Sequence, residues 1–190
     1  MHIERHPLQP FLPENASILM LGSFPPKRER WCMDFFYPNW INDMWRIMGA
    51  VFYGDKNHFV LPATKGFDKV GIENFLQEKG IALYDVATAV RRMRDNASDK
   101  YLEVEEVTDI AALLRRLSLC GAVVTTGQKA TEIFCTTMSV AEPPIGGCSP
   151  FDFEGRTIRF YRMPSSSRAY PLALERKADI YARMFASEAI

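Results

Sequence analysis

The stretch Ser17-Ile18-Leu19-Met20-Leu21-Gly22 sets how this chain of 190 residues can fold. Its apolar run is too short for a buried helix and has the length of a strand that is covered on both faces. It is followed by Phe24-Pro25-Pro26 and the polar residues 27–30, a sequence that breaks any regular element. The stretch therefore predicts a buried strand with a loop directly at its carboxyl end.

The remainder of the chain alternates between strand-like and helix-like segments. Further strands are predicted at residues 80–86, 121–126 and 157–163, and a ribbon at 151–153 leads into the last of them. Apolar residues at helical spacing predict helices from Ile41 to Phe52, from Val107 to Leu117, at 128–137 and from Pro171 to Phe185. Asn39 is placed to cap the first helix. Because strands that alternate with helices form a parallel sheet covered on both faces, we expect a single α/β domain over residues 1–190.

The composition narrows the class of protein. Lysine and arginine number 23, as do aspartate and glutamate, so the formal net charge is zero, while 47% of the residues are hydrophobic and 12% aromatic. A disordered chain would be less hydrophobic and more charged, a general nucleic-acid coat would be basic, and a disulfide scaffold would be shorter and richer in cysteine. A soluble globular domain remains.

The cysteines and the first residues of the chain bear on cofactors and location. The four cysteines, at 32, 120, 135 and 148, form no CxxC pair and have no clustered histidines beside them. Zinc and iron–sulfur sites need such clusters, so we expect reduced thiols and neither of these metal sites. Residues 1–10 carry histidines and prolines where a secretory signal needs an apolar core, and no apolar run has membrane-spanning length. We therefore expect an intracellular, cytoplasmic protein.

Three segments follow predicted strands at one edge of the sheet. They are residues 22–26 after the first strand, Tyr84-Asp85 at the end of the second, and the serine loop, residues 164–168, after the last. In open parallel sheets, ligands bind outside the carboxyl ends of the strands. Each segment alone also fits an ordinary role, as a rigid turn, a turn cap or a solvated loop. Together, with aromatic residues close by, they predict a binding pocket.

The segment Phe35-Phe36-Tyr37-Pro38-Asn39-Trp40-Ile41-Asn42 places four aromatic rings beside two amides. Flat rings beside hydrogen-bonding groups suit a flat heteroaromatic ligand, such as a base taken out of a helix. For two of the three residues Phe35, Phe36 and Trp40 we expect an ordinary place in the core. Tyr37 and Asn42 are the candidates for the pocket, because Asn42 lies at the border of the apolar helix face.

Charge is patterned along the chain despite the zero sum. Three groups are basic: Lys27, Arg28 and Arg30 against Glu29; Arg91, Arg92 and Arg94; and Arg156, Arg159, Arg162 and Arg168 against Glu154. Residues 99–109, in contrast, hold five acids and one lysine. Such runs are usually only solvated faces, but the first and third basic groups border the loops of the predicted pocket, where a phosphate backbone would have to lie.

These motifs resemble those of the uracil-DNA glycosylase superfamily. Leu21-Gly22-Ser23-Phe24-Pro25-Pro26, residues 37–45 and Met163-Pro164-Ser165-Ser166-Ser167 are similar to the regions of its two signature motifs. The serine segment is most similar to that of the mismatch-specific thymine and uracil enzymes, and residues 6–25 and 80–86 to the hypoxanthine (deoxyinosine) branch. The resemblance implies a three-layer αβα sandwich with a central four-stranded, mostly parallel sheet.

The resemblance also implies a role for each candidate site residue. Residues 22–26 would form the water-activating loop, Tyr37 would stack on the flipped base and Asp85 would contact its polar edge. Residues 165–167 would hold DNA phosphates, Arg168 would fill the gap left in the helix, and Asn42 would take part in catalysis. The implied sets are catalytic Asn42 and Ser23; base-binding Gly22, Phe24, Tyr37 and Asp85; and DNA-binding Pro164, Ser165, Ser166, Ser167, Arg168, Lys27 and Arg28.

Ser23 departs from the pattern, because the mismatch-specific enzymes carry asparagine and the classical uracil enzymes aspartate at this position. A serine hydroxyl is a poor base near neutral pH. The resemblance implies a monofunctional DNA glycosylase that releases hypoxanthine or uracil from DNA holding a damaged or mismatched base and that needs no metal and no organic cofactor. We expect it to be a monomer. Two alternatives stay open: a DNA-binding module of the same fold without hydrolysis, and a hydrolase of free nucleosides or nucleotides.

Overall fold

β2 (Ile18–Gly22) lies between β5 (Ile81–Asp85) and β8 (Ala122–Thr126) in the computed structural model, which describes residues 2–93 and 99–190. These three strands are parallel and all of their residues are buried, as the apolar stretch around β2 predicts. β10 (Arg156–Met163) extends the parallel sheet beyond β8, and β9 (Cys148–Phe153) forms its edge, antiparallel to β10.

The central sheet therefore has five strands in the order β5-β2-β8-β10-β9, and the expected count of four is wrong. The ribbon predicted at 151–153 belongs to a full edge strand. It arises because Glu154 and Gly155 both take positive φ, which makes a tight turn and returns the chain onto β10.

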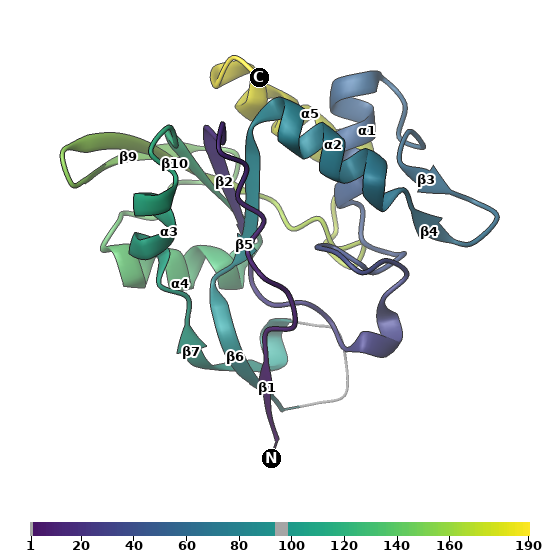
Figure 1. Cartoon of the computed structure of the whole chain (residues 1–190), viewed down its shortest axis with the longest axis horizontal. Helices are drawn as coiled ribbons and strands as arrows, with labels where there is room; N and C mark the ends of the chain where they lie inside the picture. The colour runs from purple at the N-terminus through teal and green to yellow at the C-terminus, as the bar shows by residue number, and fades with distance from the viewer. Residues whose placement is uncertain (1, 94–98) are drawn as a thin grey trace.

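Helices cover both faces of this sheet, which confirms the expected α/β class (Figure 1). α1 (Met44–Tyr53), α2 (Lys69–Lys79) and α5 (Leu174–Ser187) lie together on one side of the strands, and α3 (Ile110–Arg116) and α4 (Gln128–Met138) lie on the other. Right-handed crossovers explain this division, because the connection from β2 to β5 runs one way along the sheet and the later connections, to β8 and β10, run the other way.

The core fills the space between the sheet and each helix layer. On one side it contains Trp45 of α1 and Tyr181 of α5, both fully buried. On the other side Phe134 of α4 packs against Phe160 of β10, with ring centroids 4.4 Å apart. Aromatic side chains of this size supply most of the apolar area that holds the layers together.

The predicted start of α1 is wrong by three residues. The helix begins at Met44 instead of Ile41, because the side-chain oxygen of Asn42 accepts the N–H of Met44 at 2.9 Å. Asn39 does not cap the helix; its side-chain oxygen accepts the N–H of Ile41 at 3.2 Å, within the preceding turn. The turn between the aromatic segment and α1 is therefore built by two asparagines.

Two other predicted helices also start later than expected. α5 begins at Leu174 instead of Pro171, because residues 171–173 continue the loop that follows β10. α3 begins at Ile110, because Val107 is the last residue of a strand, β7 (Leu102–Val107), rather than part of the helix. α2 is absent from the predictions, since only Ile72, Phe75 and Leu76 make its buried face.

A second, smaller sheet extends from the carboxyl end of β5 and is also absent from the predictions (Figure 1). β1 (Ile3–Arg5), β6 (Ala87–Arg92) and β7 form it, antiparallel and in the order β1-β6-β7. A short 3-10 helix, η2 (Asp99–Tyr101), precedes β7, and Arg94 of the second basic group lies outside the described residues. The remaining elements are a second 3-10 helix, η1 (Arg28–Arg30), and the hairpin of β3 (Val60–Leu61) and β4 (Gly66–Phe67).

None of the helices in the described ranges has both the length and the apolar character that a membrane span requires. The four cysteines are free thiols. Cys120 is buried, and burial raises the pKa of its thiol to about 11.

Candidate active site

The winding of the central sheet reverses at the carboxyl end of β2. From β2 the chain crosses to β5, and from β5 it crosses back past β2 to β8. Ligands of open α/β sheets bind in the crevice at such a reversal. A cavity of about 950 Å³ opens there, and its walls include these predicted site residues: Gly22, Ser23, Phe24, Tyr37, Asn42, Asp85, Ser165, Ser166 and Ser167.

Gly22 and Asp85 line this cavity, each as the last residue of its strand. They are partners in the register of β2 and β5, and Oδ1 of Asp85 lies so close to Gly22 that a Cβ on residue 22 would overlap it. Oδ2 of Asp85 lies 2.7 Å from Nε2 of His6. An ionised carboxylate can only accept hydrogen bonds, so opposite an ionised Asp85 the donor of this bond is Nε2 of His6.

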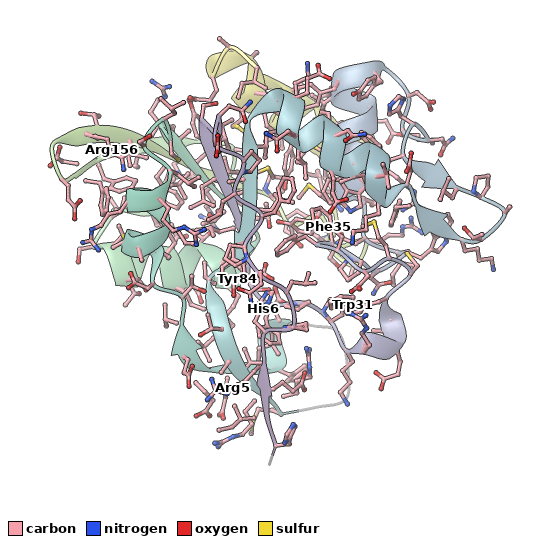
Figure 2. The ribbon with its side chains drawn as sticks, in the orientation of Figure 1. Arg5, His6, Trp31, Phe35, Tyr84 and Arg156 are labelled. Atoms are coloured by element: carbon pink, nitrogen blue, oxygen red, sulfur yellow. The ribbon has the colours of Figure 1, made fainter. Side chains whose placement is uncertain are left out.

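His6 is a site residue that the sequence analysis missed. Just beyond the pairing of β1 with β6, the backbone N–H of His6 donates to the carbonyl of Thr88 at 2.8 Å. This bond places the imidazole near the carboxyl end of β5. There it packs against Tyr84 and Phe24, with ring centroids 4.7 and 5.3 Å away, and Figure 2 shows it beside Tyr84. The small sheet thus supplies the partner that orients Asp85.

Tyr37 presents its ring to the cavity from a strained backbone. Its φ is +49°, in the left-handed region that non-glycine residues seldom adopt. The phenol oxygen lies 2.9 Å from Oγ1 of Thr126, at the end of β8, and the ring meets Trp45 edge to face at 6.0 Å. Burial raises the pKa of Tyr37 well above its usual range, so the phenol stays neutral.

Ser23 is hydrogen-bonded to a carboxylate that the sequence analysis did not connect with the site. Oγ of Ser23 donates to Oδ2 of Asp99 at 2.7 Å, and both residues line the cavity. Burial raises the pKa of Asp99, and the charge of Asp85 adds to the rise, whereas Ser23, Lys129 and Arg92 act against it. The cavity therefore has carboxylates from three different elements in its walls: Asp85 of β5, Asp99 of η2 and Glu132 of α4.

Asn42 and the serine loop are held side by side by backbone contacts. Asn42 forms an antiparallel bridge with Ser167, and the N–H of Asp43 donates to the carbonyl of Ser166 at 2.8 Å. Since the side-chain oxygen of Asn42 already accepts the N–H of Met44, its amide nitrogen is the group suited to donate to a ligand in the cavity.

Lys177, a buried lysine of α5, holds the serine loop through a hydrogen bond to its backbone. Nζ of Lys177, on α5, donates to the carbonyl of Ser167 at 2.8 Å and lies 3.7 Å from a carboxylate oxygen of Asp43. The hydroxyl of Tyr181, one turn further along α5, donates to the carbonyl of Pro164 at 2.9 Å. Burial lowers the pKa of Lys177, and the charge of Asp43 opposes that change. The loop is therefore anchored at both ends to one helix.

The other predicted DNA-binding residues do not line the cavity in the described part of the chain. Besides Pro164, these are Arg168, whose guanidinium donates to Oδ1 of Asp43 at 3.1 Å, Lys27, on the loop after β2, and Arg28, the first residue of η1. Arg28 pairs with Asp34 at 2.8 Å and lies over the ring of Trp31. Arg168 faces a second hollow of about 350 Å³ beside the serine loop.

The third basic group is divided by the fold. Arg156 and Arg159 lie at the start of β10, the end of the strand opposite the cavity, so the expected grouping of all four arginines at the pocket mouth is wrong. The cavity instead has other cationic residues in its walls: Arg30, Arg92, Lys100 and Lys129. Among residues 2–93 and 99–190, no three His, Cys, Asp or Glu side chains are arranged to hold a metal ion.

Comparisons with known proteins agree with this architecture. No model of a known protein family matches the sequence, and no curated protein matches it. The structure is similar to the solution NMR structure of a candidate uracil DNA glycosylase from Methanosarcina acetivorans, with a TM-score of 0.62 and 22% sequence identity. The match covers 96% of this chain and 99% of the other, so the two proteins share a fold over almost their whole length.

Proposed function

We propose that this protein is a monofunctional DNA glycosylase that hydrolyses the N-glycosidic bond of a deaminated base, hypoxanthine or uracil, flipped out of DNA. The observation that carries the proposal is one cavity, at the reversal point of the sheet, that joins the ring of Tyr37, the amide of Asn42 and the carboxylate of Asp85 to the serine loop. The shared fold with a candidate uracil DNA glycosylase supports it.

The fixed carboxylate of Asp85 suits a deaminated base. Deamination of adenine or cytosine converts a ring nitrogen that accepts hydrogen bonds into an N–H that donates one. Asp85, held by His6 at 2.7 Å, can only accept when ionised, so it favours the N–H of hypoxanthine or uracil over the ring nitrogen of the parent base. Tyr37 would stack on the base that Asp85 selects.

The serine loop and its neighbours suit the DNA backbone. Residues 165–167 line the cavity together with Lys129 and Arg30. Short polar groups on a loop that α5 anchors can hold phosphates in register without reading sequence. Unstacking a base costs a few kcal/mol and costs least at a mispair, which would contribute to selectivity.

Base release from labelled duplexes tests this function. We would incubate the protein with duplexes that contain hypoxanthine, uracil, xanthine or a G·T pair and detect abasic sites by alkaline strand cleavage. We expect release of hypoxanthine or uracil, and its loss in Asn42→Ala but not in Asn15→Ala, an exposed asparagine near the opposite end of β2.

Two outcomes would overturn the proposal. Duplex binding without release of any base would identify a DNA-binding module. Hydrolysis of free nucleosides, with duplex binding that does not weaken as salt is raised, would identify a small-molecule hydrolase, because phosphate contacts make DNA affinity strongly salt-dependent.

A further inference from the structure

The hydroxyl of Ser23 is not an isolated substitute for an acidic group. It donates to Oδ2 of Asp99 at 2.7 Å, and Asp99 comes from η2, a segment 76 positions further along the chain. Both side chains line the same cavity as Tyr37 and Asn42. η2, directly before β7 of the small sheet, therefore brings a carboxylate to the place where the loop after β2 provides only a serine.

On the basis of the proposed glycosylase function, we propose that Asp99 is the catalytic carboxylate of this site, which accepts a proton from the attacking water while Ser23 holds it in place. Because Ser23 binds Oδ2, Oδ1 of Asp99 can accept a hydrogen bond from that water. No active-site serine of the central sheet has to act as a base in this arrangement.

The other polar groups of the cavity suit this task less well. Asp85 is held through Oδ2 by His6 at 2.7 Å, and in the proposed function its other oxygen accepts the N–H of the flipped base. The amide of Asn42 can orient a water but cannot take its proton. Glu132 also lines the cavity, but it is exposed to solvent and its Oε1 accepts from Gln128 at 2.8 Å. Asp99 combines access to the cavity with burial and a single fixed oxygen.

The surroundings of Asp99 shift its pKa in the direction that suits a general base. Asp85 and burial oppose ionisation, whereas Ser23, Lys129 and Arg92 favour it, and the phenol of Tyr37 faces the same space. Their sum raises the pKa of Asp99 above that of an ordinary aspartate. A general base works best when its pKa approaches the working pH, so this rise increases its proton affinity while Lys129 and Arg92 keep a carboxylate available.

The reaction balances with water as the only co-reactant. The bond between C1′ and the base nitrogen breaks, and the base leaves with the bonding pair. The water oxygen forms a bond to C1′ as one of its protons passes to Asp99. Asp99 returns this proton to solvent, and the base anion takes one from solvent, which leaves a free base and an abasic site. Before attack, the negative carboxylate also stabilises the positive charge that develops on the sugar.

Single-turnover base release by Asp99→Asn tests the assignment, with Asp152→Asn, an exposed aspartate of β9, as the matched control. We expect the Asp99→Asn substitution to lower the rate roughly 100-fold or more, the usual contribution of general-base catalysis, with duplex affinity nearly unchanged. The acidic limb of the pH–rate profile should disappear. In Ser23→Ala that limb should move to higher pH, because the hydrogen bond from Ser23 lowers the pKa of Asp99.

A second variant, Asp99→Ala, distinguishes the loss of a catalytic group from the loss of the fold. Asp99→Ala should be nearly inactive and should regain activity with added formate, a small carboxylate that fills the vacated position. Three outcomes would overturn the catalytic role and leave the glycosylase function standing: an Asp99→Asn rate within about threefold of the wild type, an unchanged acidic limb, or the absence of formate rescue. A threefold change is too small, because general-base catalysis contributes roughly 100-fold or more. A wild-type protein that releases no base from any duplex would instead overturn the function and this role with it.

Discussion

Nε2 of His6 and Oδ2 of Asp85 lie 2.7 Å apart, although 79 positions separate the two residues in the chain. The exposed fractions of their side chains are only 2% and 10%, so the contact is shielded from water. A hydrogen bond to a buried carboxylate is strong, and a buried carboxylate without a partner is costly. His6 directly follows β1, so the pairing of this N-terminal strand with β6 helps to position Asp85 in the site.

We therefore predict that His6→Ala destabilises the protein by about 1.5–3 kcal/mol, the range for a hydrogen bond to a charged group. Urea unfolding at neutral pH measures this change. Base release should fall as well, because Asp85 loses the contact that orients it. His2→Ala is the control, since His2 is exposed; equal effects of the two substitutions would show that the His6–Asp85 bond contributes nothing specific.

Gly22→Ala should disturb the same carboxylate from the other side. The added Cβ would overlap Oδ1 of Asp85, so the aspartate must move or the strand ends must separate. We expect a loss of about 1–3 kcal/mol in the free energy of unfolding, as for other overpacked sites, and slower base release. Gly121→Ala, at the start of β8, adds its methyl group to open space and should change neither quantity. Unchanged base release in Gly22→Ala would mean that the position of Asp85 is not critical.

The central sheet could be predicted from the sequence because three of its parallel strands, β2, β5 and β8, are short, largely apolar runs that are visible in a few neighbouring residues. The small sheet could not, because β1 and β6 are joined by pairing between distant parts of the chain and β7 is largely exposed. The position of Asp99 depends on that sheet, because η2 directly precedes β7. Asp99 falls in an acidic run that, as sequence, indicates only a solvated face.

The loops of the candidate site could be predicted from the sequence, but the side-chain pairs within it could not. Loops at the carboxyl ends of strands follow from the strand pattern, and these loops do line the cavity. The pairs His6–Asp85 and Ser23–Asp99 carry no local signal, because each joins segments that meet only after the sheets form. Lys177 is similar: it lies on the buried face of α5, where helical periodicity alone predicts an apolar residue, and its partner is the carbonyl of Ser167.

The pH dependence of stability should report the environment of Asp99. Its pKa in the folded protein is raised, chiefly by burial, so between the unfolded and folded pKa values the native state holds a proton that the unfolded state has lost. Stability from this group is present at low pH and is lost as the pH rises through the folded pKa. Asp99→Asn should therefore be more stable than the wild type at neutral pH, with the difference shrinking toward the ordinary aspartate pKa of about 4. Urea unfolding at several pH values measures this, and a pH-independent difference would contradict the raised pKa.

Arg168 must leave a partner if it fills the gap that a flipped base creates. Its guanidinium lies 3.1 Å from Oδ1 of Asp43 and its side chain is half exposed, so the pair is accessible to solvent and weak enough to open. We predict that Arg168→Ala lowers flipping, measured by 2-aminopurine fluorescence beside the target base, roughly tenfold, because unstacking costs a few kcal/mol that the inserted side chain would offset. Affinity for an undamaged duplex should fall much less. Arg176→Ala, an exposed arginine on α5, should affect neither measurement, and an equal loss of flipping and of ground-state binding in Arg168→Ala would assign Arg168 to phosphate contact instead.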